Sequence, residues 1–139
     1  EINTIGTDKM FDITSLSGGE LSRLLLSVKL IDDEEDKVIL FDEIDSSIGG
    51  ETARSAALEM KKNSTKNQII VITHFPQTAS LADRHIVVRK SVGEGDVETE
   101  ISILDKAGRV KELARMMGNS ESADFLAAAE KMVEENLGK

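Results

Sequence analysis

The sequence has 139 residues, of which 17 are basic and 26 acidic, giving a formal net charge of −9. It contains no cysteine, which excludes disulfides, thiolate metal sites and cysteine nucleophiles. Nucleic-acid binders usually present a basic surface to phosphates, so the acidic balance argues against DNA binding by this chain alone. No apolar run could span a bilayer and no signal pattern opens the sequence, so we expect a single cytoplasmic domain.

Residues 17–20 read Ser-Gly-Gly-Glu and lead into a helical pattern formed by Leu21, Leu24, Leu25 and Val28. Ser17 and Glu20 have the spacing of a capping box, in which each side chain accepts a hydrogen bond from the other residue's amide. The box does not explain Gly18 and Gly19, each of which costs about 1 kcal/mol relative to alanine in a helix. Bare amides at a helix N-terminus would let a phosphate approach. Residues 17–20 alone do not decide between a capping box and a phosphate contact.

Residues 38–41 form a continuous apolar run, which predicts a strand covered on both faces of a parallel sheet. Asp42 and Glu43 follow it, at the sheet edge where ligands bind in open α/β folds. Asp42 can hold Mg²⁺ through its hard oxygen ligands. Glu43 can orient or deprotonate a water in line with a terminal phosphate. A strand also often ends in Asp that caps the next turn.

A helix and a second strand follow these carboxylates. The helix has one apolar face, made of Ala53, Ala56, Ala57 and Met60, and the strand covers residues 69–72. Strand, helix and strand with short connections predict a right-handed parallel unit.

His74 then lies at the same edge as Glu43 and could hydrogen-bond a γ-phosphate or an attacking water, although a lone histidine is more often structural. His85, inside a strand pattern, is interpreted as structural.

The remaining pattern predicts an edge strand near the N-terminus and, toward the C-terminus, a short helix, an antiparallel hairpin and two helices. The expected ranges are 10–13 for the edge strand, 76–81 for the short helix, 86–88 and 99–104 for the hairpin, and 109–117 and 122–136 for the last helices.

Together these elements resemble the ATPase heads of the ABC superfamily. Residues 16–20 look like the signature motif, residues 38–43 look like Walker B with its catalytic glutamate, and His74 looks like the switch histidine. Transporters usually have proline after that glutamate, whereas Asp-Glu-Ile-Asp at 42–45 is similar to the chromosome-maintenance and repair branch. Within that branch, three stretches are most similar to the RecN family of double-strand-break repair proteins: 41–50, 73–77 and 109–118.

The resemblance implies catalytic roles for Glu43 and His74, a Mg²⁺ ligand at Asp42, and ATP contacts by Ser17, Gly18, Gly19 and Glu20. These contacts would act in trans, on ATP sandwiched between two heads of a homodimer. One position departs from the superfamily, because Gly49 occupies the place where an Asp usually follows Walker B. RecN-like proteins resemble this chain there, and the departure leaves open which residue couples the two sites.

The sequence contains no phosphate loop of the form G-x-x-x-x-G-K-[ST]. In the repair branch that loop lies in the N-terminal lobe, separated from the signature by a coiled coil. The resemblance therefore implies that residues 1–139 are the C-terminal lobe of a split P-loop NTPase head. Its fold would be α/β, a mostly parallel sheet flanked by helices with a C-terminal hairpin and helices. We expect ATPase activity only in the full-length protein, with the N-terminal lobe and DNA as its partners near the nucleoid.

Three alternatives carry different functions. A transporter ATPase half would share the chemistry, but the missing proline and the tail helices argue against it. A non-catalytic interaction module could have kept this lobe without ever having a phosphate loop. An unrelated α/β domain would need four motifs in the right order by coincidence.

Overall fold

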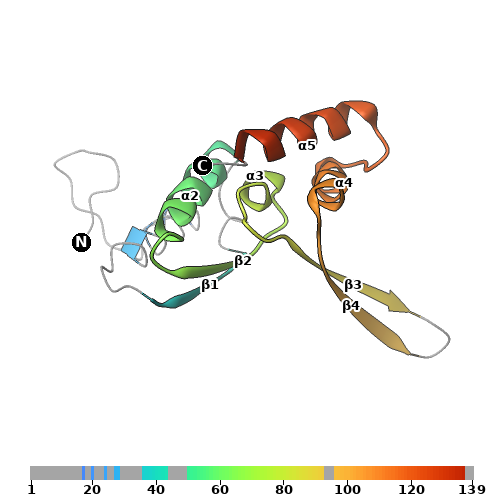
Figure 1. Cartoon of the computed structure of the whole chain (residues 1–139). Helices are drawn as coiled ribbons and strands as arrows, with labels where there is room; N and C mark the ends of the chain where they lie inside the picture. The colour runs from blue at the N-terminus through green and yellow to red at the C-terminus, as the bar shows by residue number, and fades with distance from the viewer. Residues whose placement is uncertain are drawn as a thin grey trace. The chain divides into compact units, whose positions relative to one another are not determined.

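The computed structural model describes residues 17, 20, 24, 27–28, 36–43, 50–92 and 96–136 (Figure 1). Several predicted features lie outside these residues: the edge strand at 10–13, the helix residues 21–23 and 25–26, Gly18 and Gly19, and Gly49. The chain divides into two compact units, residues 1–75 and 76–139.

The first unit contains the predicted strand–helix–strand arrangement. β1 (Val38–Asp42) and β2 (Gln68–Ile72) pair in parallel, with Val38 opposite Gln68 and Asp42 opposite Ile72. α2 (Gly50–Asn63) connects them. The strands differ from the expected ranges by one residue each, and the parallel unit is confirmed.

One face of α2 forms the core of the first unit. Its residues Ala53, Ala56 and Met60 are buried together with Phe41 of β1. The half-buried side chains around this cluster come from both strands and the segment after β2: Ile39, Ile69, Val71 and Phe75. Because alanine leaves little side chain between helix and sheet, α2 packs closely on the strands. The predicted apolar face of this helix is therefore confirmed.

The described residues leave the second face of the strand pair exposed. Val38 and Leu40 are 65% and 61% exposed, and their neighbours Ile70 and Ile72 are exposed as well. Successive side chains of a strand alternate between faces, so α2 can cover only one set of them. The described residues thus cover β1 on one face, and the expectation that both faces are covered stays a prediction.

The second unit contains α3, a hairpin and two helices. The elements are α3 (Pro76–Ala79), β3 (Ile86–Val92), β4 (Val97–Ile103), α4 (Lys106–Met117) and α5 (Ala123–Asn136). β3 and β4 pair antiparallel along their full lengths, which confirms the predicted hairpin and extends it.

α3 ends two residues earlier than expected. The amides of Leu81 and Ala82 donate to carbonyls only three residues back, so the helix closes in tight turns. The carbonyls of Ser80 and Ala82 accept hydrogen bonds from the buried guanidinium of Arg109, at 3.2 and 2.7 Å. Arg109 thus ties α4 to the end of α3.

α4 begins three residues before the expected start. Asp105 is its N-cap, and its Oδ1 accepts a hydrogen bond from the Gly108 amide at 2.7 Å. This bond satisfies one of the amides that a helix start leaves unpaired. The helix ends where expected, at Gly118, whose φ of 132° is accessible to glycine at little cost.

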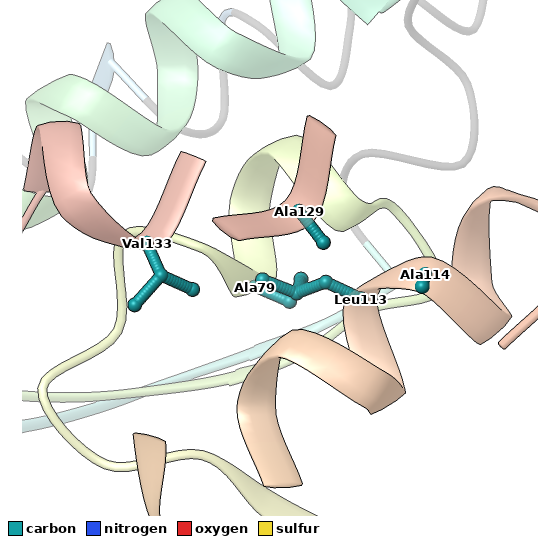
Figure 2. Close-up of a cluster of buried hydrophobic side chains, with 5 residues drawn as sticks. All are labelled: Ala79, Leu113, Ala114, Ala129 and Val133. Atoms are coloured by element: carbon teal, nitrogen blue, oxygen red, sulfur yellow. The ribbon is translucent and has the colours of Figure 1, made fainter. Parts of the chain in front are cut away.

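α4 and α5 pack through a small aliphatic core (Figure 2). Leu113 and Ala114 of α4 meet Ala129 and Val133 of α5, and Ala79 of α3 completes the cluster. Leu113 is the largest fully buried side chain among the described residues. The two helices predicted at the end of the chain are confirmed.

Replacing Leu113 with alanine should destabilise the second unit by about 2–5 kcal/mol, because the change removes buried methyl groups and leaves a cavity. Leu58→Ala is the matched control, since Leu58 is 41% exposed on α2. We expect the control to cost under about 1 kcal/mol. Urea unfolding of the 139-residue chain measures both values, and equal costs would contradict the packing described for Leu113.

Candidate functional site

The candidate site lies at the carboxyl ends of β1 and β2. Asp42 is the last residue of β1 and stands opposite Ile72, the last residue of β2. The Glu43 amide donates to the Ile72 carbonyl at 2.9 Å, so the ladder continues one residue past the strand. Both carboxylates are exposed. The parallel register therefore places two acidic side chains at the edge where β2 also ends.

Glu43 has a left-handed backbone, with φ of 46°. A residue with a side chain adopts this region at a cost on the order of 1 kcal/mol. The neighbouring ladder bond holds Glu43 in place despite that cost. Strained residues of this kind concentrate at functional sites, so the conformation adds a structural argument to the chemical one.

His74 follows β2 at the same edge, two residues after the carbonyl that Glu43 binds. Its imidazole is exposed and lies 4.5 Å from the Phe75 ring between centroids, at a tilt of 41°. Phe75 packs on the core of the first unit, and its amide donates to Thr73 Oγ1 at 2.9 Å. His74 therefore follows the same strand end that the Glu43 amide binds, and its ring contacts that of Phe75.

The predicted capping box is present between Ser17 and Glu20. The Ser17 amide donates to Glu20 Oε2 at 2.9 Å, and the Ser17 hydroxyl donates to the same oxygen at 2.7 Å. The Glu20 amide in turn donates to Ser17 Oγ at 3.4 Å. Gly18 and Gly19 lie outside the described residues, so the phosphate contact of this segment stays a prediction.

Within the described part of the chain, no three His, Cys, Asp or Glu side chains gather as a metal site. In the magnesium role predicted for it, Asp42 would contribute one carboxylate, and phosphate oxygens and water the other ligands. This division is usual for Mg²⁺ at nucleotide sites. An exposed carboxylate at a strand end fits that role.

A second charged cluster, in the other unit, was not predicted. Glu112 is only 6% exposed and accepts from Arg115 Nε at 3.0 Å and Nη2 at 2.6 Å. It also pairs with Arg89 of β3 at 3.5 Å. The cluster joins α4 to the hairpin, and a helical pattern of charges gives no signal that one glutamate is buried.

The pKa values of this cluster follow from burial and charge. Burial raises the pKa of Glu112, but the Arg115 hydrogen bonds and the charges of Arg115, Arg89 and His85 outweigh it, and the net shift is downward. Burial lowers the pKa of His85, and the charge of Arg109 lowers it further against the opposing effect of Glu112. The His85 Nδ1 atom is buried without a hydrogen-bond partner. The structural role assigned to His85 agrees with this environment.

The sequence is similar to curated DNA repair proteins named RecN. It is 38% identical over 111 residues to RecN of Bacillus subtilis, 43% over 120 residues to that of Rickettsia felis, and 40% over 120 residues to that of Treponema pallidum. These matches cover 78%, 84% and 84% of this chain but 19%, 22% and 21% of the relatives. The chain thus spans about a fifth of their length. No family model matches.

A solved structure from work on "ATP-driven dimerization and DNA stimulated activation of SMC ATPases" shares the fold. Its TM-score is 0.59 at 24% identity, over 82% of this chain and 69% of that one. The predicted resemblance to RecN and the predicted head fold are confirmed. No helix in the described ranges is long and apolar enough to cross a membrane.

Acidification should destabilise the chain between pH 7.5 and 5.5, in part through His85. Its pKa is lowered in the folded state, so below about 6.5 the unfolded chain binds a proton that the folded chain resists. Stability is therefore present above the unfolded pKa and falls as the pH drops below it. His85→Gln should flatten this loss in thermal unfolding at the two pH values, and a variant with the wild-type slope would contradict the assignment.

Proposed function

We propose that this chain is the C-terminal lobe of an ATPase head in a RecN-like protein that acts on DNA double-strand breaks. The observation that carries the proposal is the convergence of Asp42, Glu43 and His74 at one edge of a parallel strand pair. It occurs in a chain 36–44% identical to RecN proteins. Sequence similarity and site chemistry thus favour the same function.

The substrate is ATP, and each residue at the edge has a role that its chemistry allows. Asp42 would bind Mg²⁺, which when bound neutralises charge on the phosphate oxygens. Glu43 would orient the attacking water and accept its proton. His74 would donate a hydrogen bond to the γ-phosphate. The ladder bond of Glu43 fixes its backbone before ATP arrives, and such preorganisation favours catalysis.

The signature segment would act on ATP bound to a second head. Ser17, Gly18, Gly19 and Glu20 would close a sandwich in which each nucleotide meets residues of both subunits. The capping box sets Ser17 at the start of the segment, and the proposed ATP contact is supported by the resemblance of residues 16–20 to the signature motif. ATP-driven dimerization is also named for the SMC ATPases that share this fold.

The phosphate loop would come from the N-terminal lobe of the same polypeptide, joined through a coiled coil. The relatives are about five times longer than their matched segment, which leaves room for both parts. DNA would be bound by the complete protein at the nucleoid in the cytoplasm. The net charge of −9 argues against DNA binding by this lobe alone, so the main DNA contacts would lie in other parts of that protein.

Glu43→Gln in the full-length protein should preserve ATP binding and lower turnover by roughly 10²–10⁴-fold, because the amide cannot accept the proton of water. Steady-state hydrolysis and nucleotide-binding titration measure the two effects. Glu59→Gln on α2 is the matched control, since Glu59 is exposed outside the proposed site. Near-normal hydrolysis by Glu43→Gln would remove the catalytic role.

Ser17→Arg should block ATP-dependent pairing of heads and leave ATP binding by each head intact. A long cation at the signature would fill the space that the partner's triphosphate needs. Sedimentation of the full-length protein with and without ATP measures the pairing, and Ser55→Arg on α2 is the control at an exposed serine. If Ser17→Arg still pairs with ATP, the trans contact is wrong.

A further inference from the structure

We propose that a basic pocket in the second unit binds the phosphate group of a small phosphorylated molecule. The pocket has a volume of about 440 Å³ and is lined by residues of β3, of α4 and of the segments at either end of α4. Its volume falls within the range that small-molecule sites occupy in proteins. Its cationic side chains are Arg89, Lys111 and Arg115, which we call the cationic triad. The triad belongs to the second unit, whereas Asp42 and Glu43 belong to the first, so the proposed ATP chemistry gives it no role.

A buried carboxylate holds two members of the cationic triad in place. Glu112 Oε1 accepts hydrogen bonds from Nε and Nη2 of Arg115, and its Oε2 lies 3.5 Å from Nη2 of Arg89. Both arginine side chains are nevertheless more than half exposed, at 62% and 55%. Glu112 therefore fixes two guanidinium groups, from α4 and β3, while part of each stays accessible to a ligand. Donors that are already fixed lose less conformational freedom when a ligand binds.

The pocket gathers positive charge in a chain whose net charge is −9. Its lining has three basic residues and two acidic ones, and one of these acids, Glu112, already pairs with two of the cations. Among the described residues, Lys111 forms no ion pair. It also stands four positions before Arg115 on α4, where like charges destabilise a helix. An arrangement that opposes helix stability in this way favours a role in binding an anion.

A phosphate group matches the cationic triad better than a carboxylate does. A phosphate monoester carries a charge of roughly −1.5 to −2 at neutral pH and three acceptor oxygens, one for each cation. Guanidinium groups bind phosphate through two parallel hydrogen bonds. A carboxylate brings one charge and two oxygens, so it would leave one cation of the triad unmatched. Ser120 adds a hydroxyl donor to the same pocket.

Acidic side chains around the pocket limit the size of the ligand. Glu121 belongs to the lining and is exposed. On β4, Glu100 stands opposite Arg89, and Glu98 is exposed two residues away on the same strand. A nucleic acid presents many phosphates and needs a basic surface that continues beyond one pocket. A polyanion would meet these carboxylates, whereas a single phosphate group would not, so the geometry favours a small molecule.

An NMR titration of the 139-residue chain with inorganic phosphate, at constant ionic strength, tests the site. We expect saturable shifts at the amides of Gly108, Lys111 and Ser120 and none on α2. Lys111→Gln should weaken phosphate binding roughly three- to tenfold, because a charge-assisted hydrogen bond is lost. Lys62→Gln is the matched control, since Lys62 is exposed on α2, and it should leave the affinity unchanged. Neither substitution touches Glu112, so both variants should keep the fold.

Shifts that never saturate, or that persist unchanged in Lys111→Gln, would overturn the proposal, because they would report general ionic screening. Acetate is the second probe, and we expect it to bind about tenfold more weakly than phosphate, since it carries less charge and fewer oxygens. Equal binding of acetate would overturn the phosphate assignment in favour of a carboxylate ligand.

A short DNA duplex is the third probe, and we expect it not to compete with phosphate for the pocket. Competition at the amides of Gly108, Lys111 and Ser120 would overturn the assignment to a small molecule and give the pocket to nucleic acid. The titrations contain no ATP and use residues outside the proposed ATP site. This result is therefore separate from the hydrolysis and pairing measurements, and either proposal can fail alone.

Discussion

The candidate site depends on the parallel pairing of β1 and β2. Asp42 and His74 are 32 positions apart in the sequence, and no local interaction could bring them to one edge. The register that sets Asp42 opposite Ile72 does so, and the bond from the Glu43 amide to the Ile72 carbonyl carries it one residue further. α2 makes the register possible, because its alanine-rich face packs on both strands at once.

Much of this architecture was predictable from the sequence for one physical reason. Strands and helices show different apolar periods, and α2 displays its period clearly through Ala53, Ala56 and Met60. The apolar run of β1 likewise predicted the sheet edge at which Asp42 and Glu43 lie. For the outer face of β1 the apolar run is less informative. It predicts that both faces of the strand are buried, but it does not show which segment covers each face.

Other features depend on tertiary structure and gave no sequence signal. The buried Glu112 is one charge among several on α4, and only its ion pairs to Arg115 and Arg89 distinguish it. The left-handed conformation of Glu43 is equally hidden, since that region favours glycine or asparagine. The early start of α4 was missed because Gly108 is a poor helix former, although Asp105 caps its amide.

The exposed sheet faces and the proposed chemistry point to one physical conclusion. In the first unit, which holds the residues proposed to hydrolyse ATP, the described residues cover one face of β1 and β2, and one face of the β3–β4 hairpin in the second unit is exposed as well. Apolar surface left in water is a source of binding free energy for whatever covers it. If the chain is one lobe of an ATPase head, as we propose, that head would gain stability when its lobes combine. The burial that drives this assembly would then also complete the proposed ATP site.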